Sequence, residues 1–478
     1  MNTPPRLLGP AEVREALGIS APTYFRWLRD GRLKGVRVGG RWKFPRSEVD
    51  RLLGRVDPQE VRRAQAIRAA IEAYAERLVG LGWKRKEVEA MAQSQDGPAL
   101  ATLVLSHALD RGATDIHVIP RAEGLELRER INGALSEVPS SLPQPATDDL
   151  VRSVKALAGL DVEVTDAPQE GRCFTAFKER QVGTFVSTYP TDLGEALTIR
   201  LLDPATLRLR FAELGFGKTV SDQVLRAVDR PNGVFLVNGP TSSGKTTTLY
   251  CLLKFLYQPG RKVMTVEDPV EVHLDGLLQA NVTERMGFED AMRAMLRNDL
   301  DVAMVSELRT PEVMRLLFQM AASGHLMLSA MHAPDAISAI RRLLDIGKVP
   351  SRLLAENLLG VLDQRLVRLS CPHCRAMKLI AATDADRLKL SGPGRKLRVA
   401  ANRGCDRCQG TGVHDRCLVG ALLAPGKDLR AALDAGEVGE EALRAALPAN
   451  SRTLRDAVLE RLAGGDLSPS SAIEALGV

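Results

Sequence analysis

The sequence predicts an α/β protein built around a parallel sheet, and three observations lead to that prediction. An apolar run at residues 233–237 has the length and branching of a buried strand, and a glycine-rich loop and a helical segment follow it directly. Two further apolar runs, 262–266 and 301–305, each lead into acidic residues. In an open α/β sheet the carboxyl ends of the strands form the ligand crevice, so we expect the loop and the acids to share one site.

The loop after the first of these strands has the pattern of a phosphate-binding loop, G-x-x-x-x-G-K-T. Its glycines let successive N–H groups turn inward around a phosphate, at a helix N-terminus whose dipole favours anions. Lys245 would reach the β- and γ-phosphates of a nucleotide, and the Thr246 hydroxyl would ligate Mg²⁺. An ordinary Gly/Ser loop before a helix is the alternative, and the preceding strand argues against it. The residues expected to hold nucleotide are Gly239, Pro240, Thr241, Ser242, Ser243, Gly244, Lys245, Thr246 and Thr247.

Length and charge narrow the function further. The 478 residues are enough for about three domains. The chain shows no signal-peptide pattern and no run approaching about 18 apolar residues, so we expect a cytoplasmic protein. Residues 1–56 carry twelve Lys and Arg against five Asp and Glu, a balance of +7, whereas the whole chain carries +6. This basic segment suggests nucleic acid or an acidic membrane surface as a partner, and a solvated basic face is the alternative.

Residues 6–54 have the pattern of a small winged helix-turn-helix: two short helices around a turn, two strands meeting at Gly39-Gly40, and a last helix beginning at Ser47. The stretch resembles the excisionase and MerR-type helix-turn-helix family, whose wing it carries as the letters VGGRW. That resemblance implies that the second helix enters the major groove of double-stranded DNA while the wing contacts phosphate. A protein-docking role is the alternative. The residues expected to contact DNA are Thr23, Tyr24, Arg26, Arg41 and Lys43.

The middle of the chain divides into two segments. Residues 55–98 are interpreted as a helical linker without a motif, because an alanine-rich helix and a shorter helix fill them. Residues 99–206 predict an α+β domain, since alternating apolar residues there indicate strands. Its expected elements are a helix ending at Asp110, strands at 115–120 and 125–131, a helix at 150–160, and strands at 172–177, 181–187 and 196–202.

Four of the seven cysteines form two C-x-x-C pairs, Cys371 with Cys374 and Cys405 with Cys408. Four thiolates in two such pairs can surround a Zn²⁺ ion tetrahedrally, each pair from its own tight turn. Thirty residues separate the pairs, a gap that a helix at 384–390 would fill. Two redox-active C-x-x-C motifs are the alternative.

The order of the motifs resembles the secretion traffic ATPases, specifically the type II secretion and type IV pilus assembly branch. The motifs are GPTSSGKTTTLY, VEDPVE, LDVAMVSELR, SGHLMLSAMH and CPHC…CDRC, preceded by RGATDIHVIP, APQEGR and VSTYPTDLGEALTIRLLD. The likeness spans residues 99–425 and favours zinc at the cysteines. It implies an α/β fold with a RecA-like P-loop NTPase core. The expected domains are 1–54 winged helix-turn-helix, 55–98 linker, 99–206 α+β (PAS-like), 207–370 RecA-like, 371–420 tetracysteine zinc subdomain and 421–478 helical.

The resemblance also implies roles for residues outside the loop. Glu267, in the family's Asp box, would orient or deprotonate the attacking water, and Glu307 would match the Walker B acid that holds Mg²⁺. Arg200, in the preceding domain, would reach the γ-phosphate. The remaining catalytic candidates are His325 and His332 of the His box, and Arg293 and Arg297, whose i, i+4 spacing puts them on one helical face.

The chain departs from the family pattern at one position of particular weight. Phe185 stands where the family places a second arginine, just before the VST stretch. An arginine that stabilises charge on the transferring phosphoryl contributes several kcal/mol, so its loss would slow hydrolysis. The sequence leaves open whether Arg172 or Arg180 compensates. Smaller departures include Ser306 in place of glycine and Thr310 in place of aspartate.

Two functions fit these features. The first is a ring ATPase, expected to be a homo-hexamer that uses ATP, Mg²⁺ and Zn²⁺, sits at the cytoplasmic side of the inner membrane, and drives a membrane platform protein in type IV pilus assembly or type II secretion. The second is a hydrolytically weak or inactive nucleotide-binding paralogue that acts through its helix-turn-helix as a DNA-binding regulator or adaptor. Phe185 supports the second.

Overall fold

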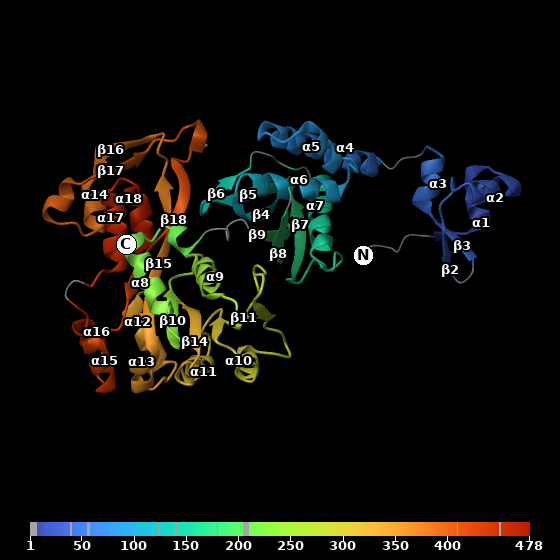
Figure 1. The fold of residues 1–478 in the computed structure, drawn as a ribbon. Helices are drawn as coiled ribbons and strands as arrows, with labels where there is room; N and C mark the ends of the chain where they lie inside the picture. The colour runs from blue at the N-terminus through green and yellow to red at the C-terminus, as the bar shows by residue number, and fades with distance from the viewer. Residues whose placement is uncertain are drawn as a thin grey trace. The chain divides into compact units, whose positions relative to one another are not determined.

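The computed structural model describes most of the chain in two compact units (Figure 1). Unit 1 contains residues 1–129, 136–175 and 185–200, and unit 2 contains residues 130–135, 176–184 and 201–478. In the described part of the chain, no helix is long and apolar enough to cross a membrane. The described residues are 7–38, 41–54, 58–122, 124–138, 142, 144–178, 180–203, 210–408, 410–448 and 451–478.

The N-terminal module is the winged helix-turn-helix that the sequence predicts. Its two helices, α1 (Pro10–Leu17) and α2 (Ala21–Arg29), flank a turn in which the Ser20 hydroxyl accepts the Thr23 N–H and caps α2. Strands β1 (Leu7–Leu8), β3 (Arg41–Pro45) and β2 (Val36–Val38) form the wing, and α3 (Arg46–Leu52) follows. The predicted turn at Gly39-Gly40 and the Ser47 side chain lie outside the described residues. The core of the module contains Leu8, Val13, Tyr24, Leu33, Phe44 and Val49.

The segment predicted to be a linker is packed against the α+β domain, and this corrects the sequence interpretation. Helices α4 (Pro58–Gly80) and α5 (Arg85–Met91) lie where helices were expected. The α4 helix buries Ile67, Ile71, Tyr74 and Leu78, whose spacing gives it one apolar face. Arg63 on α4 also forms an ion pair with Asp149 on α7 (Gln144–Leu157).

An α+β domain follows, built around a six-stranded sheet in the order β6-β5-β4-β9-β8-β7, and most of its residues belong to unit 1. Helix α7 begins six residues before the predicted start, and β6 was not predicted. Two buried ion-pair groups stabilise the domain: Lys155 with Glu195, and Glu129 with His107 and Arg111. The remaining elements are α6 (Gly97–Asp110), β4 (Ala113–Arg121), β5 (Gly124–Ile131), β6 (Ala134–Glu137), β7 (Glu170–Phe177), β8 (Arg180–Thr191) and β9 (Gly194–Leu202).

Unit 2 is organised around a seven-stranded sheet in the order β12-β11-β13-β14-β10-β15-β18, parallel except for its last pair. The central strand β10 (Gly233–Asn238) is buried along its whole length. Because side chains alternate across a strand, Val234 and Leu236 face one helical layer while Phe235 and Val237 face the other. The other parallel strands are β11 (Val263–Glu267), β12 (Leu278–Asn281), β13 (Val302–Val305), β14 (Leu326–Met331) and β15 (Leu358–Ser370).

Helices cover both faces of this sheet (Figure 1). Phe235 and Val237 pack against the layer that contains α8 (Lys218–Val228) and α9 (Lys245–Leu256). The opposite layer contains α10 (Phe288–Leu296), α11 (Pro311–Ala322), α12 (Ala336–Asp345), α13 (Ser351–Asn357), α15 (Lys427–Asp434) and α16 (Glu440–Ala445).

The cysteine region is an excursion from the sheet, and the chain returns to the sheet after it. Strand β15 runs directly into Cys371, and β18 (Val413–Leu423) pairs with β15 along its length. The sequence placed only helices after residue 420, so it missed that β18 closes the sheet edge. Between the cysteine pairs lie β16 (Arg375–Leu379), α14 (Ala382–Arg387) and β17 (Arg398–Asn402). Helices α17 (Leu454–Ala463) and α18 (Pro469–Leu476) share a core with this excursion.

Candidate functional site

The predicted phosphate-binding loop lies between β10 and α9, at the carboxyl edge of the sheet. Gly244 adopts a left-handed conformation with φ of 84°, as the first turn of α9 begins. A Cβ at Gly239 would lie 2.6 Å from the Gln364 carbonyl oxygen of the neighbouring strand, so only glycine fits there. Pro240, Thr241 and Ser242 are exposed at the tip, Ser243 is buried, and Thr246 and Thr247 open α9 half-buried.

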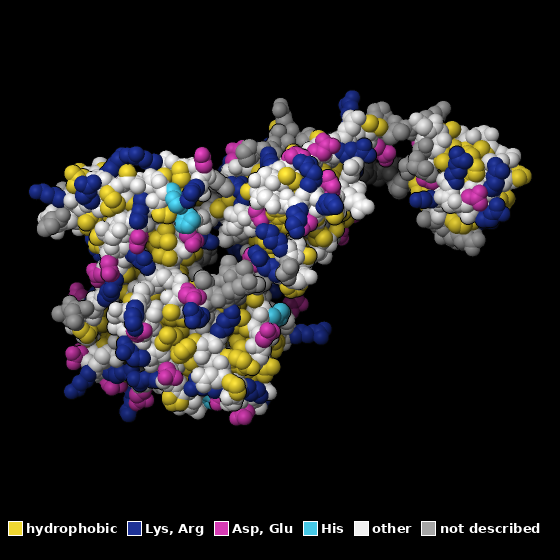
Figure 2. Space-filling model, turned by 45° about the horizontal axis from the view of Figure 1, so that its top comes forward, with side chains coloured by type: hydrophobic (Ala, Val, Ile, Leu, Met, Phe, Trp, Pro, Cys, Tyr) yellow, Lys and Arg dark blue, Asp and Glu magenta, His cyan; other side chains and the backbone are white. Residues whose placement is uncertain are grey.

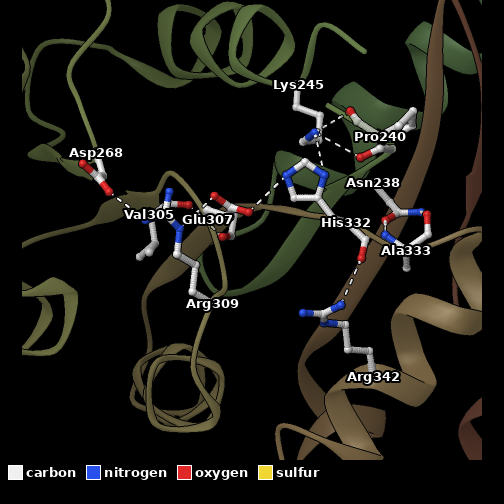
Figure 3. A network of polar contacts seen from close by, with 12 residues as sticks. Asn238, Pro240, Lys245, Asp268, Val305, Glu307, Arg309, His332, Ala333 and Arg342 are labelled. Atoms are coloured by element: carbon white, nitrogen blue, oxygen red, sulfur yellow. Dashed lines mark hydrogen bonds and ion pairs between the residues drawn. The ribbon is translucent and has the colours of Figure 1, made fainter. Parts of the chain in front are cut away.

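Lys245 folds back over this loop. Its Nζ donates to the Gly239 carbonyl at 3.0 Å and to the Pro240 carbonyl at 2.7 Å, and lies 3.4 Å from Nδ1 of His332 (Figure 3). Burial lowers the pKa of Lys245 to about 8, although the nearby charge of Glu307 opposes the shift. Two carbonyl oxygens therefore hold the Lys245 ammonium, and negatively charged phosphate oxygens would bind it more strongly.

His332 connects the loop to the acidic strand ends. Its Nε2 lies 3.1 Å from Oε1 of Glu307, which follows β13 (Figure 3). Burial, aided by the charge of Lys245, lowers the pKa of His332, so the ring is neutral at neutral pH. A neutral ring can accept from Lys245 at Nδ1 and donate to Glu307 at Nε2, which gives a continuous contact from lysine to carboxylate. The structure thus brings together three residues that the sequence singled out separately.

Two further residues join this network, and the sequence interpretation gave them no role. Arg309 donates from Nε to Glu307 at 3.1 Å and from Nη1 to Asp268 at 2.7 Å, so it ties the ends of β13 and β11 together (Figure 3). The two carboxylates raise the pKa of Arg309 against the effect of burial. Asp268 directly follows β11, and Arg309 lies two residues after Glu307, so both belong to the acidic segments that the sequence singled out.

The residue beside the predicted Mg²⁺ ligand is Glu271. The Thr246 hydroxyl donates to Oε1 of Glu271 at 3.1 Å, and the Glu271 side chain is exposed at the strand edge. The sequence placed Glu271 at this edge but gave the catalytic role to Glu267, four positions earlier. The geometry instead places the exposed Glu271 carboxylate beside the Thr246 hydroxyl, the predicted Mg²⁺ ligand.

Glu267 has a different role from the predicted one. It is 1% exposed, and its carboxylate accepts from Thr265 at 2.5 Å, from Gln279 at 3.1 Å and from the Tyr250 hydroxyl. Burial raises the pKa of Glu267, although these three donors oppose the shift. Its side chain faces the core beneath α9, where it joins α9 to β12. The prediction that Glu267 activates water is wrong for this geometry, because its oxygens are buried and already bonded.

The two predicted histidines lie at opposite ends of β14. His325 precedes the strand, where its Nδ1 contacts the Met320 carbonyl at 2.9 Å and its own carbonyl accepts the Gly233 N–H. Gly233 begins the strand that ends at the phosphate loop, so His325 lies at the amino edge of the sheet. A six-residue strand spans about 20 Å, which excludes His325 from the loop that His332 touches.

The arginine pair on α10 is not brought to the loop. Arg293 forms an i, i+4 ion pair with Glu289 at 3.2 Å, and Arg297 caps the C-terminus of the same helix. Both side chains are exposed, and within the described residues neither contacts the phosphate-binding loop. The two arginines follow the predicted i, i+4 spacing, and in this structure their side chains are exposed to solvent.

The arginines of unit 1 are arranged around Phe185. Arg172 on β7 places its guanidinium 5.7 Å from the centre of the Phe185 ring on β8. Arg200 on β9 pairs with Asp115 at 3.1 Å and is half exposed. The two-residue turn between β8 and β9 sets Phe185 opposite Arg200, consistent with the contact of Gly183 with Leu202. Arg180, which belongs to unit 2, pairs with Asp203 of the same unit.

The departure at Thr310 is explained by helix capping. Its hydroxyl accepts the Val313 N–H at 3.3 Å and caps α11, a role that aspartate fills equally well. Ser306 extends the β13 edge, where its N–H donates to Val266. Neither residue contacts the loop within the described part of the chain.

The four cysteines converge, and their geometry fits a metal ion. All four Sγ atoms lie within 4.8 Å of one another, and single pairs lie 3.7 to 4.0 Å apart. Tetrahedral zinc with Zn–S bonds of about 2.3 Å requires sulfurs about 3.8 Å apart. Although burial opposes ionisation, N–H groups of Cys405 and Gly412 that point at the Cys408 sulfur lower the pKa of Cys408 to about 6, whereas burial and the neighbouring thiols raise the pKa of Cys374 to about 11. The sulfur–sulfur distances of the donor set are those that Zn²⁺ requires.

The helix-turn-helix module presents a different set of residues from the predicted one. Pro22, Phe25, Arg26 and Arg29, at i, i+3, i+4 and i+7, form the exposed face of α2. Lys and Arg side chains are spread over the visible face of this module (Figure 2). Phe25 is 66% exposed, a feature that the sequence interpretation missed.

The prediction that Tyr24 contacts DNA is wrong. Its ring is 2% exposed and packs edge-on against Phe44, so it belongs to the core of the module. The other predicted contacts, Thr23, Arg26, Arg41 and Lys43, remain at least partly exposed.

Comparison with known sequences gives two matches that cover nearly the whole chain. A family model described as Type II/IV secretion system protein matches residues 93–474, and one described as Helix-turn-helix domain matches residues 7–56. The Type II secretion system ATPase E of Vibrio cholerae is 35% identical over 428 residues, which cover 88% of this chain and 84% of that protein. The Type IV pilus assembly ATPase PilB of Thermus thermophilus is 34% identical over 417 residues, which cover 83% of this chain and 46% of that protein.

Comparison with solved structures supports the fold. The pilus retraction motor PilT with bound ADP aligns with a TM-score of 0.53 and 22% identity, covering 78% of this chain and 96% of that chain. The ATPase DotB of Legionella pneumophila aligns with a TM-score of 0.57 and 18% identity, covering 80% of this chain and 96% of that chain.

Proposed function

The chain belongs to the Type II/IV secretion system protein family, and from that premise we propose that it is a Mg²⁺-dependent ATP hydrolase working as a homo-hexameric ring. The observation that carries the proposal is the meeting of Lys245, Thr246, Glu271 and Glu307 at one loop, with His332 joining the lysine to Glu307. A cation, a hydroxyl and two acids around a backbone cradle are the groups that phosphoryl transfer to water requires.

In the proposed mechanism each of these residues has one task. Lys245 exchanges the Gly239 and Pro240 carbonyls for the β- and γ-phosphates. Thr246 and Glu307 would hold Mg²⁺, and the ion would supply positive charge that neutralises the phosphates. Glu271 orients the attacking water and takes its proton, a role that its contact with Thr246 supports. His332 keeps Lys245 and Glu307 in fixed positions.

The proposed charge partners of the γ-phosphate are Arg200 and Arg172. Because Arg172 lies over Phe185, we propose that it supplies, from the neighbouring strand, the cation missing from that position of β8. Cation–π contact holds the guanidinium there without neutralising it, which leaves its charge available.

Steady-state hydrolysis of MgATP tests this proposal. We expect turnover by the wild-type protein, and loss of nearly all turnover in Lys245→Ala. Arg172→Ala should reduce turnover substantially, while Arg210→Ala, which removes an exposed arginine paired with Glu213, should have no effect. No turnover by the wild type, or unchanged turnover in Lys245→Ala, would contradict the proposal.

The work proposed for this hydrolase is to drive an inner-membrane platform protein that moves pilin or pseudopilin subunits. The relatives named for type II secretion and type IV pilus assembly support this assignment. The protein would then lie at the cytoplasmic face of the inner membrane. Co-purification with a platform protein from solubilised membranes, in the presence and absence of nucleotide, tests it.

A second function is favoured by the exposed face of α2. Phe25, Arg26 and Arg29 present an apolar group and two cations on a helix of the type that enters the major groove. A catalytically weak protein that regulates through DNA is the alternative role for the whole chain. Strong activation of hydrolysis in Phe185→Arg would favour that alternative, because it would show that the natural protein is hydrolytically impaired.

Titration of the full-length protein with duplex DNA over a salt series tests the DNA interaction. Binding through Arg26 and Arg29 must weaken as salt rises, because phosphate contacts release counterions. The double variant Arg26→Ala/Arg29→Ala should bind more weakly with a shallower salt dependence. Equal binding by both proteins would exclude α2 as the DNA contact.

A further inference from the structure

A buried glutamine on the strand beside β10 supports the phosphate-binding loop. Gln364 of β15 is 0% exposed. Its Nε2 donates to the Ser243 carbonyl at 2.7 Å, and its Oε1 accepts from the Thr248 hydroxyl at 2.8 Å. Ser243 is the loop residue before Gly244, and Thr248 lies in the first turn of α9. One side chain therefore joins the loop to the start of the helix.

This contact fixes the direction of the next N–H group. In a trans peptide the C=O and the following N–H point in opposite directions. Because the Ser243 carbonyl points toward Gln364, the Gly244 N–H points away from β15. No hydrogen bond from that N–H occurs in the described part of the chain. An N–H group held outward in this way is what a phosphate-binding loop offers to an anion.

The preceding residue on β15 holds the other end of the loop. Asp363 accepts from Nδ2 of Asn238 at 2.6 Å and from the Ala336 N–H at 2.7 Å. Asn238 comes directly before Gly239, and its side chain also bonds both backbone groups of Ala333, next to His332. Side chains alternate along a strand, so Asp363 and Gln364 hold the two ends of the loop from opposite faces of β15.

We propose that Gln364 is a positioning residue for nucleotide: its amide holds the Ser243 carbonyl so that the Gly244 N–H faces the bound phosphate. The inference rests on the proposed nucleotide binding. The inference adds to the proposed function that a residue which does not touch the ligand sets the orientation of the loop.

An amide is needed here because it has a hydrogen-bond donor on one side and an acceptor on the other. The Ser243 carbonyl requires a donor and the Thr248 hydroxyl requires an acceptor, which glutamine supplies in one orientation only. A glutamate carboxylate has no donor and would repel the Ser243 carbonyl. A protonated glutamate has one O–H and one free oxygen, so it can restore both bonds.

Binding of a fluorescent Mg·ADP analogue to the full-length protein, measured across a pH series, tests the inference. Losing one hydrogen bond that orients a ligand contact costs about tenfold in affinity, so Gln364→Glu should bind about tenfold more weakly than the wild type above neutral pH. Its affinity should approach that of the wild type as the pH falls and the carboxyl takes up a proton. Gln364→Met should be weakened without recovery.

The controls isolate the loop contact. The charged and titrating groups around Gln364, namely Asp363, Lys245, Arg365 and His332, are present in the wild type, whose pH series corrects for them. Gln319→Glu makes the same charge change on the exposed face of α11 and should bind like the wild type. Thr248→Val removes the hydroxyl that orients the amide and should weaken binding even if Gln364→Glu fails to fold.

The outcomes separate the inference from the proposed function. A wild-type protein that binds no nucleotide at any pH overturns both. Wild-type binding together with unchanged affinity in Gln364→Glu at high pH overturns the inference alone. So does a weakened, folded Gln364→Glu whose affinity does not recover at low pH.

Discussion

At the scale of single residues, the site depends on the burial of each polar group and on the hydrogen bonds that it makes. Lys245 is bonded to two carbonyls and a histidine, whereas Glu271 keeps an exposed carboxylate beside Thr246. Glu267, in the same short motif, is buried with three donors. The exposure of the carboxylate, rather than the motif itself, distinguishes Glu271 from Glu267.

The two glutamates should therefore respond differently to removal of their charge. Glu271→Gln removes the exposed base and should reduce kcat by at least about a hundredfold, while nucleotide affinity changes little. Glu267→Gln should act mainly on stability, since it disturbs a buried network, and should lower the melting temperature. Steady-state kinetics and thermal melting of both variants check this. A larger loss of kcat in a folded Glu267→Gln would reverse the assignment.

Nucleotide affinity should fall at alkaline pH. Burial lowers the pKa of Lys245 to about 8, below its ordinary value, so the free protein loses the ammonium as the pH rises through that range. Bound phosphate favours the charged form, so binding above this pKa requires uptake of a proton. Affinity should be about tenfold lower at pH 9 than at pH 7. Titration calorimetry in buffers of different ionisation enthalpy measures both effects, and an affinity independent of pH up to 10 would contradict the prediction.

At the scale of elements, the strands and helices of the sheet were predictable, whereas their partners were not. Apolar runs marked β10, β11, β13 and β14, because strands buried on both faces are continuous in hydrophobicity. Strand β18 was missed because no local signal says that a chain returns to a sheet after a long excursion. The packing of α4 was missed for the same reason: an amphipathic helix shows that it has a partner but does not identify it.

Zinc should stabilise the junction between β15 and the cysteine excursion. Cys371 directly follows β15, and the cluster also holds Cys408, shortly before β18, so metal binding fixes both strand ends. Removing Zn²⁺ with a chelator, or replacing Cys374 with serine, should lower the melting temperature by several degrees. Elemental analysis should find one zinc per chain in the wild type. Cys173→Ser, outside the cluster, is the control, and an unchanged melting temperature after complete metal loss would contradict the prediction.

At the scale of the whole molecule, sequence patterns identified the fold class and the family but only part of the site. Lys245, Thr246, Glu307 and His332 could be predicted to lie at the same edge of the sheet, because each lies on the loop or at a strand end of that edge. Arg309, Glu271 and Gln364 were not assigned roles, because their importance comes from contacts across strands. His325 was misplaced because the motif that contains both histidines spans the full length of β14, and the two ends of a strand lie on opposite edges of the sheet.

The pairing of β15 with β18 has a consequence for how this architecture can change. Ser370 and Val413 are register partners, so the chain leaves the sheet and returns to it at the same place. The residues between Ser370 and Val413 are therefore an insertion between two neighbouring strands of the sheet. A change in the number of residues between them does not by itself shift the pairing of β15 with β18, which includes Asp363 and Gln364. The phosphate-binding loop therefore takes its support from a part of β15 that lies before the chain enters the cysteine region.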